Sequence, residues 1–167
     1  EKYMVDDLIE SGLEPADLHA YAHSKAVPQG ARAAYVIPYF DTEGQPIVDE
    51  GEYVCMWRKK CDIPGSKSRY IQPPAKELAR HDLPRFLPYI LPQTIELPGD
   101  ILYICEGEKK TASFLKHIRE PALGIGGCRM WHDPDGDGVH PWIMDVIRSK
   151  GIRHVVLVPD GDLWQYD

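Results

Sequence analysis

Apolar and polar positions follow one pattern after about residue 97 and a different pattern before it. In the second part, apolar runs at 101–105, 122–125 and 154–158 enclose two windows of helical periodicity, 108–118 and 139–149. Runs that are apolar on both faces and alternate with helices are typical of a parallel sheet covered by helices. We therefore predict an α/β core over 98–167. Because crossovers between parallel strands are right-handed, we expect the carboxyl ends of these strands to share one edge.

The first part, 1–97, is predicted to be a smaller α+β lobe. Residues 1–22 carry apolar positions at helical spacing, and Pro15 opens a second short turn. The run 33–40 and the run that reaches Trp57 predict two strands joined by a glycine-containing turn, and Pro38 favours an edge position for the first. From Arg58 onward prolines interrupt the chain, so we expect turns rather than long elements.

Acidic residues directly follow the first and the third apolar runs. Glu106 follows the first, and Asp160 and Asp162 follow the third. Ligand sites of open α/β sheets lie at this edge, and carboxylates that converge there without a cation would raise one another's pKa. A divalent ion with oxygen ligands, Mg²⁺ or Mn²⁺, would complete the cluster and points to phosphoryl chemistry. The alternative is that these are ordinary solvated acids of turns and helix starts.

Three motifs resemble the Toprim domain of DNA primases, topoisomerases and related nucleases. They are Ile104-Cys-Glu-Gly-Glu-Lys-Lys-Thr-Ala112, Gly124-Ile-Gly-Gly127 and Val155-Val-Leu-Val-Pro-Asp-Gly-Asp162. The likeness is closest to phage and plasmid primases, in which a smaller lobe precedes the Toprim core. It covers residues 98–165 and, more weakly, Tyr35–Tyr70.

The resemblance implies that Glu106, Asp160 and Asp162 are catalytic residues that hold Mg²⁺ or Mn²⁺, with Glu106 as a metal ligand or as a base. It implies a nucleotidyltransferase of DNA replication, a DNA primase fragment that joins nucleoside triphosphates into short primers on a single-stranded DNA template. Family members usually continue beyond the Asp-x-Asp motif, whereas this chain ends at Asp167, so we expect a truncated core. A helicase or further domains of a longer polypeptide are the expected partners. The alternatives are a Toprim nuclease or topoisomerase-like fragment, and a non-catalytic single-stranded DNA-binding module of a replication protein.

Residues beside the acidic motifs are candidates for nucleotide binding. Lys109 and Lys110 open the helix after Glu106, where an ammonium group can meet a triphosphate, although neighbours on a helix diverge. Gly126 and Gly127 follow the second run, where we expect a tight turn on the active edge, since no Gly-Lys-Ser/Thr sequence follows.

A local basic patch is a candidate surface for single-stranded DNA. Basic side chains flanked by aromatic ones, here Trp57 and Tyr70, suit a strand whose phosphates meet cations while its bases stack. A solvated loop is the alternative. The basic residues are Arg58, Lys59, Lys60, Lys67 and Arg69.

The loop 133–138 has acids at positions 1, 3 and 5 and glycine at position 6, as in the first half of an EF-hand. Met144 stands where the bidentate glutamate of an EF-hand would be, so a polar loop without calcium is the favoured interpretation.

Composition narrows the class of partner. With 19 basic and 26 acidic residues among 167, the net charge is −7, which excludes binding of nucleic acid by bulk charge. No run approaches 18 apolar residues and no signal core begins the chain, so we expect an intracellular, cytoplasmic protein without membrane contact, in the host cytoplasm if it is phage-encoded. The 4 cysteines are expected to be reduced, and the spacing of Cys55 and Cys61 is poor for zinc.

Overall fold

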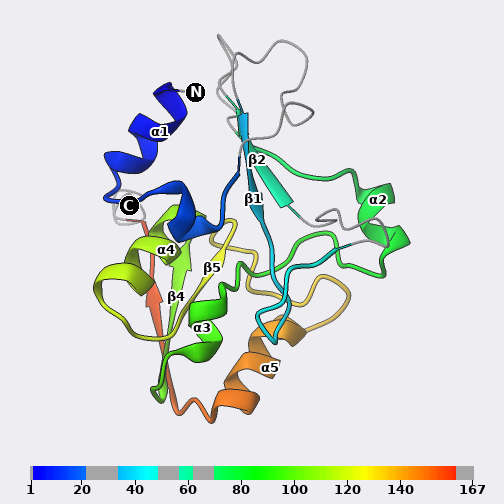
Figure 1. Ribbon diagram of the computed structural model, residues 1–167. Coiled ribbons are helices and arrows are strands. Elements are labelled where there is room, and N and C mark those ends of the chain that lie inside the picture. The colour runs from blue at the N-terminus through cyan, green and yellow to red at the C-terminus, as the bar shows by residue number, and fades with distance from the viewer. Residues whose placement is uncertain (1, 22–33, 49–56, 62–69, 161–167) are drawn as a thin grey trace, which may run out of the picture.

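The computed structural model describes residues 2–21, 34–48, 57–61 and 70–160, and Figure 1 shows how their helices and strands are arranged. Two three-stranded sheets form the framework. One is antiparallel and comes from the first part of the chain, and the other is parallel and comes from the second part.

The first part begins with helix α1 (Lys2–Ile9) and the 3-10 helix η1 (Pro15–Leu18). Its sheet has the order β1-β2-β3, with β1 (Ala34–Pro38), β2 (Trp57–Cys61) and β3 (Tyr70–Ile71). Pro38 is the last residue of β1, which is an outer strand of this sheet, as its proline predicted.

The prediction of turns after Arg58 was wrong for the start of that stretch. Arg58, Lys59 and Lys60 belong to β2, the central strand, which pairs with both neighbours. Helices α2 (Ala75–Arg80) and α3 (Pro92–Glu96) also interrupt the expected turns. With 6 and 5 residues, these helices are too short to show an apolar period in the sequence.

The second part confirms the predicted parallel sheet with flanking helices. Its strands are β4 (Ile101–Glu106), β5 (Ala122–Ile125) and β6 (His154–Val158), in the order β5-β4-β6. Helix α4 (Glu108–His117) connects β4 to β5, and α5 (Pro141–Lys150) connects β5 to β6. Each of these two helices has 10 residues. Within the described ranges, no helix has both the length and the apolar character that crossing a bilayer requires.

Helices α4 and α5 pack against opposite faces of this sheet. The first crossover moves from β4 to β5 and the second moves back across β4 to β6, so right-handed connections place the two helices on different faces. The apolar clusters agree with this: Cys105 of β4 packs in the same cluster as Ala112 of α4, whereas Leu102 of β4 clusters with Ile143 of α5.

The two parts share hydrogen bonds and core packing. Tyr89 and Gly124 exchange two backbone hydrogen bonds, N···O 2.7 and 2.8 Å, and the Thr94 hydroxyl donates to the Ala122 carbonyl at 2.6 Å. The cluster on the α4 face also includes Leu8 and other residues of the first part. The boundary near residue 97 stays a prediction, and these contacts cross it.

Candidate active site

The parallel sheet brings two of the predicted acids to one edge. Glu106 is the last residue of β4, and Asp160 follows the end of β6 by two residues. Cys105 pairs with Val158 in the register of these neighbouring strands, so their carboxyl ends lie together. Both acids line a cavity of about 730 Å³, which also touches Lys110 and Gly126.

Gly107 makes the sharp turn from β4 into α4. Its φ of 89° lies in the region that favours glycine, and its N–H donates to the Ile125 carbonyl at 2.8 Å. The Gly107 carbonyl in turn accepts from the Thr111 hydroxyl at 2.8 Å. Helix α4 therefore begins at the cavity. Its N-cap residue is Gly107, which has no side chain to accept hydrogen bonds from the first N–H groups of the helix. Such a helix start carries partial positive charge and favours anions.

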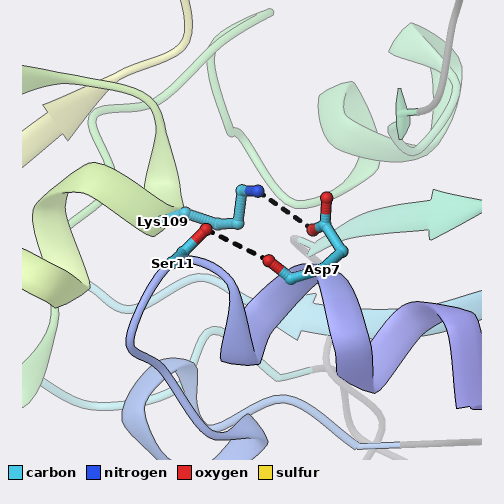
Figure 2. Close-up of polar contacts among 3 residues, drawn as sticks. All are labelled: Asp7, Ser11 and Lys109. Atoms are coloured by element: carbon cyan, nitrogen blue, oxygen red, sulfur yellow. Dashed lines mark hydrogen bonds and ion pairs between the residues drawn. The ribbon is translucent and has the colours of Figure 1, made fainter.

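The two lysines that open α4 have different partners. Lys109 donates to the Asp7 carboxylate, Nζ···Oδ2 2.9 Å, and the Ser11 hydroxyl donates to the Asp7 carbonyl at 3.1 Å (Figure 2). Lys109 thus ties α4 to α1. Lys110 forms an ion pair with Asp160. Both lysines line the cavity, although adjacent residues of a helix point about 100° apart and their ammonium groups have different carboxylate partners.

The ion pair of Lys110 with Asp160 changes the expected electrostatics of the cluster. The acids were predicted to need a divalent cation to offset their repulsion, whereas here an ammonium group from α4 already neutralises one of them. Both side chains remain partly exposed, at 34% for Lys110 and 46% for Asp160, so the pair is open to exchange with other ions.

Glu108 lines the same cavity, although no sequence motif predicted it to be a site residue. Its side chain is buried and accepts a hydrogen bond of 2.6 Å from the Tyr39 hydroxyl. Burial, together with the charge of Glu108, raises the pKa of Tyr89 well above its usual value. The motif Glu-Gly-Glu was a signal for a second carboxylate, but nothing in the sequence near it pointed to Tyr39, 69 residues away.

Several other predicted residues lie apart from this cavity or outside the described residues. Gly127 does not line the cavity, although Gly126 does. The backbones of Arg58, Lys59 and Lys60 form β2, and their side chains are outside what the structure describes. The predicted residues that lie wholly outside the described ranges are Asp162, Lys67 and Arg69.

Hydrogen bonds within the acidic loop 133–138 involve both its backbone and the Asp133 side chain. The Asp133 carboxylate accepts from the Asp135 N–H at 3.0 Å, and the Asp133 N–H donates to the Gly138 carbonyl at 3.0 Å. Across the described part of the chain, no group of three or more His, Cys, Asp and Glu side chains is placed to hold a metal ion. Glu106 and Asp160 supply carboxylates from two residues, a donor set that suits Mg²⁺, which binds few protein ligands and keeps waters or phosphates.

Comparison of the chain with models of known protein families gave no match, and comparison with curated proteins gave none. The resemblance to Toprim primases therefore rests on the three motifs. What the structure adds is a parallel α/β sheet that carries two of the motif acids at one edge.

Proposed function

We propose that this chain is the catalytic part of a Toprim-type DNA primase, which joins nucleoside triphosphates into short primers on single-stranded DNA. One observation carries the proposal: Glu106 and Asp160, from neighbouring parallel strands, line a single cavity together with Lys110. Carboxylates and a cation at the carboxyl edge of an α/β sheet are the groups that phosphoryl transfer uses. A primase acts where DNA is replicated, so the proposal includes a cytoplasmic location.

Glu106 and Asp160 are the described residues that would hold Mg²⁺ or Mn²⁺, and the motif adds Asp162 as a third. When bound, the metal would neutralise negative charge on the phosphates as the bond to the leaving group breaks. The Glu106 carboxylate either binds this ion or accepts the proton of the attacking hydroxyl group.

Lys110 and the start of α4 would bind the triphosphate. The Lys110 ammonium is a point charge with three donors, and it lies beside Asp160 on the cavity wall. An arriving triphosphate would compete with Asp160 for this ammonium, which would release the aspartate to the metal. The N–H groups of the first turn of α4 attract the same anion.

The template would lie on the basic patch defined in the sequence, Arg58, Lys59, Lys60, Lys67 and Arg69. Because the whole chain carries a charge of −7, such local cations would supply the contacts with DNA phosphates. A helicase or further domains of a longer polypeptide would supply unwinding.

The test is primer synthesis on a single-stranded template with nucleoside triphosphates and Mn²⁺ or Mg²⁺. Glu106→Gln and Asp160→Asn keep the shape of each side chain and remove its charge, and each is expected to lower the rate by about 10²-fold or more. The matched control is Asp145→Asn, which removes a charge from the exposed side of α5 and should leave the rate unchanged.

A second pair of variants separates the two lysines. Both lysines line the cavity, but Lys109 is paired with Asp7 of α1 and Lys110 with Asp160. Lys110→Met should therefore weaken triphosphate binding more than Lys109→Met, which removes an equal charge. Full primer synthesis by Glu106→Gln would overturn the proposal. Nicking of supplied DNA without synthesis would assign the cavity to a nuclease. Binding of single strands without any product, in parent and variants alike, would assign the chain to a non-catalytic binding module.

A further inference from the structure

A second, smaller hollow lies beside Glu106. Its volume is about 150 Å³, and its lining includes Ile104, Ile125, Leu157, Cys128 and Trp131. Glu106 lines both this hollow and the larger cavity. Among the described residues, Glu106 is the one charged side chain on the walls of the hollow, whereas two lysines and two further acids line the larger cavity.

The hollow lies on the α5 face of the sheet. Leu157 of β6 pairs with Ile104 of β4, and residues paired in a parallel register point to the same face. Ile104 and Ile125 belong to the apolar cluster that contains the buried residues of α5. The larger cavity instead touches Ser113 and His117 of α4, so Glu106 stands between a cavity lined by several charged groups and a hollow lined mainly by apolar ones.

Two large apolar side chains of this hollow are exposed. Leu157 is 68% exposed and Trp131 is 37% exposed. The Trp131 ring stacks on His132, with ring centroids 3.7 Å apart and planes 26° from parallel. An aromatic ring supported in this way, beside an aliphatic wall, presents apolar surface to a flat ligand.

We propose that this hollow binds the nucleobase of the nucleotide whose phosphates lie in the larger cavity, with Trp131 as the stacking residue. The inference rests on the proposed function. A nucleotide joins a flat, apolar base to an anionic phosphate chain. The larger cavity offers Lys110 and the start of α4 to the phosphates, and the smaller hollow offers Trp131 and Leu157 to the base. Because every base has a π face, stacking alone predicts little preference among the four bases.

The test compares a nucleoside triphosphate with inorganic tripolyphosphate, by calorimetry on the full chain with Mg²⁺. Loss of stacking in Trp131→Ala should weaken nucleoside triphosphate binding by roughly 5- to 150-fold and leave tripolyphosphate binding unchanged. Trp131→Phe should retain most of the affinity. Val139→Ala, which shortens another exposed apolar side chain of the same loop, is the control and should change neither.

Cys128 gives a readout that needs no variant. It is a free, exposed cysteine on the wall of this hollow, so its alkylation rate, followed by peptide mass spectrometry, reports what occupies the hollow. A nucleoside triphosphate should slow the alkylation of Cys128, and tripolyphosphate should not.

The outcomes separate the inference from the function on which it rests. Equal nucleoside triphosphate binding by Trp131→Ala and the parent, with binding still weakened by Lys110→Met, overturns the base site and leaves the proposed function intact. Failure of both ligands to bind overturns the proposed function and the base site together. Protection of Cys128 by increasing protein concentration, but not by nucleotide, would assign the hollow to contact between copies of the chain and would also overturn the base site.

Discussion

The two faces of the parallel sheet are packed by different kinds of contact. On the α5 face the contacts are aliphatic, because Leu102 and Ile104 of β4 lie in one cluster with Ile143 and Val146 of α5. On the α4 face, Tyr103 of β4 packs against Phe114 of α4, with ring centroids 4.5 Å apart. The other strand residues on this face are small, among them Cys105 and Ala122, and the helix lies close to them. An alanine-type Cβ at Gly124 would lie 2.5 Å from the Thr111 hydroxyl oxygen of α4.

Polar contacts also distinguish the α4 face. The first turn of α4 holds the buried hydrogen bond from Tyr39 to Glu108, the ion pair of Lys109 with Asp7 and that of Lys110 with Asp160. This difference between the two faces explains why the charged groups of the candidate site lie on the α4 side of the sheet. Both faces have an apolar core, but the α4 face adds buried hydrogen bonds, ion pairs and close backbone approach to its apolar packing, and these contacts bring charged groups to the cavity.

The largest effect is expected from an apolar truncation on the α5 face. Leu102 is fully buried in the centre of the sheet, and Leu102→Ala should lower the free energy of unfolding by about 2–5 kcal/mol, through lost apolar burial and the cavity that remains. Urea unfolding followed by circular dichroism measures the change.

Leu157→Ala is the matched control for Leu102→Ala, because Leu157 lies on the same face and is 68% exposed. Its cost should stay within about 0.5 kcal/mol. Equal costs for the two variants would contradict the view that cover by α5, rather than the apolar strand sequence, stabilises this face.

A polar truncation on the α4 face should have the next largest effect. Tyr39→Phe removes the hydroxyl that donates to the buried Glu108 carboxylate, at an expected cost of about 1.5–3 kcal/mol in the free energy of unfolding. Tyr35→Phe is the control. The buried Tyr35 hydroxyl has no hydrogen-bond partner within the described part of the chain, so its loss should leave stability unchanged or slightly raised. The same unfolding measurement on both variants decides the matter, and a larger loss for Tyr35→Phe would refute this assignment of partners.

The second part of the fold was predictable from the sequence because its elements carry strong local patterns. The run 154–158 coincides with β6, and the predicted window 108–118 contains α4 (Glu108–His117). In the first part, β2 was not predicted over its basic residues, because a strand that reads Trp-Arg-Lys-Lys-Cys carries no run of apolar positions. Pairing with β1 and β3, not local sequence, makes it a strand.

Only the part of the candidate site that follows from the sheet topology was predictable from the sequence. Parallel strands with right-handed crossovers placed Glu106 and Asp160 at one edge, and that argument needs no side-chain contact. The ion pair of Lys110 with Asp160 and the bond from Tyr39 to Glu108 join residues 50 and 69 positions apart, and no sequence pattern specifies such partners. The hollow beside Trp131 was missed for the same reason, since its walls come from β4, β5, β6 and the loop before α5.

The smallest of these effects concerns the glycine motif that ends β5. Gly124 and Gly127 belong to the same sequence motif, but the space around them differs in the structure. A Cβ at Gly124 would lie 3.1 Å from Tyr89 Cβ and 3.2 Å from the Gly107 carbonyl oxygen, in addition to its contact with Thr111. A Cβ at Gly127 would meet no atom of the described residues within 4 Å. Gly124→Ala should therefore cost about 1–3 kcal/mol in unfolding free energy through overpacking, and Gly127→Ala should stay within about 0.5 kcal/mol.

Gly124→Ala also tests whether close approach on the α4 face positions the cavity. The Gly107 carbonyl accepts hydrogen bonds from both the N–H and the hydroxyl of Thr111, so a side chain at position 124 would push directly on the turn that begins α4. We expect triphosphate affinity to fall in Gly124→Ala under conditions where the variant is still folded, and to hold in Gly127→Ala. If Gly124→Ala loses stability but binds triphosphate as well as the parent, the packing of α4 on β5 stabilises the fold without setting the geometry around Glu106 and Lys110.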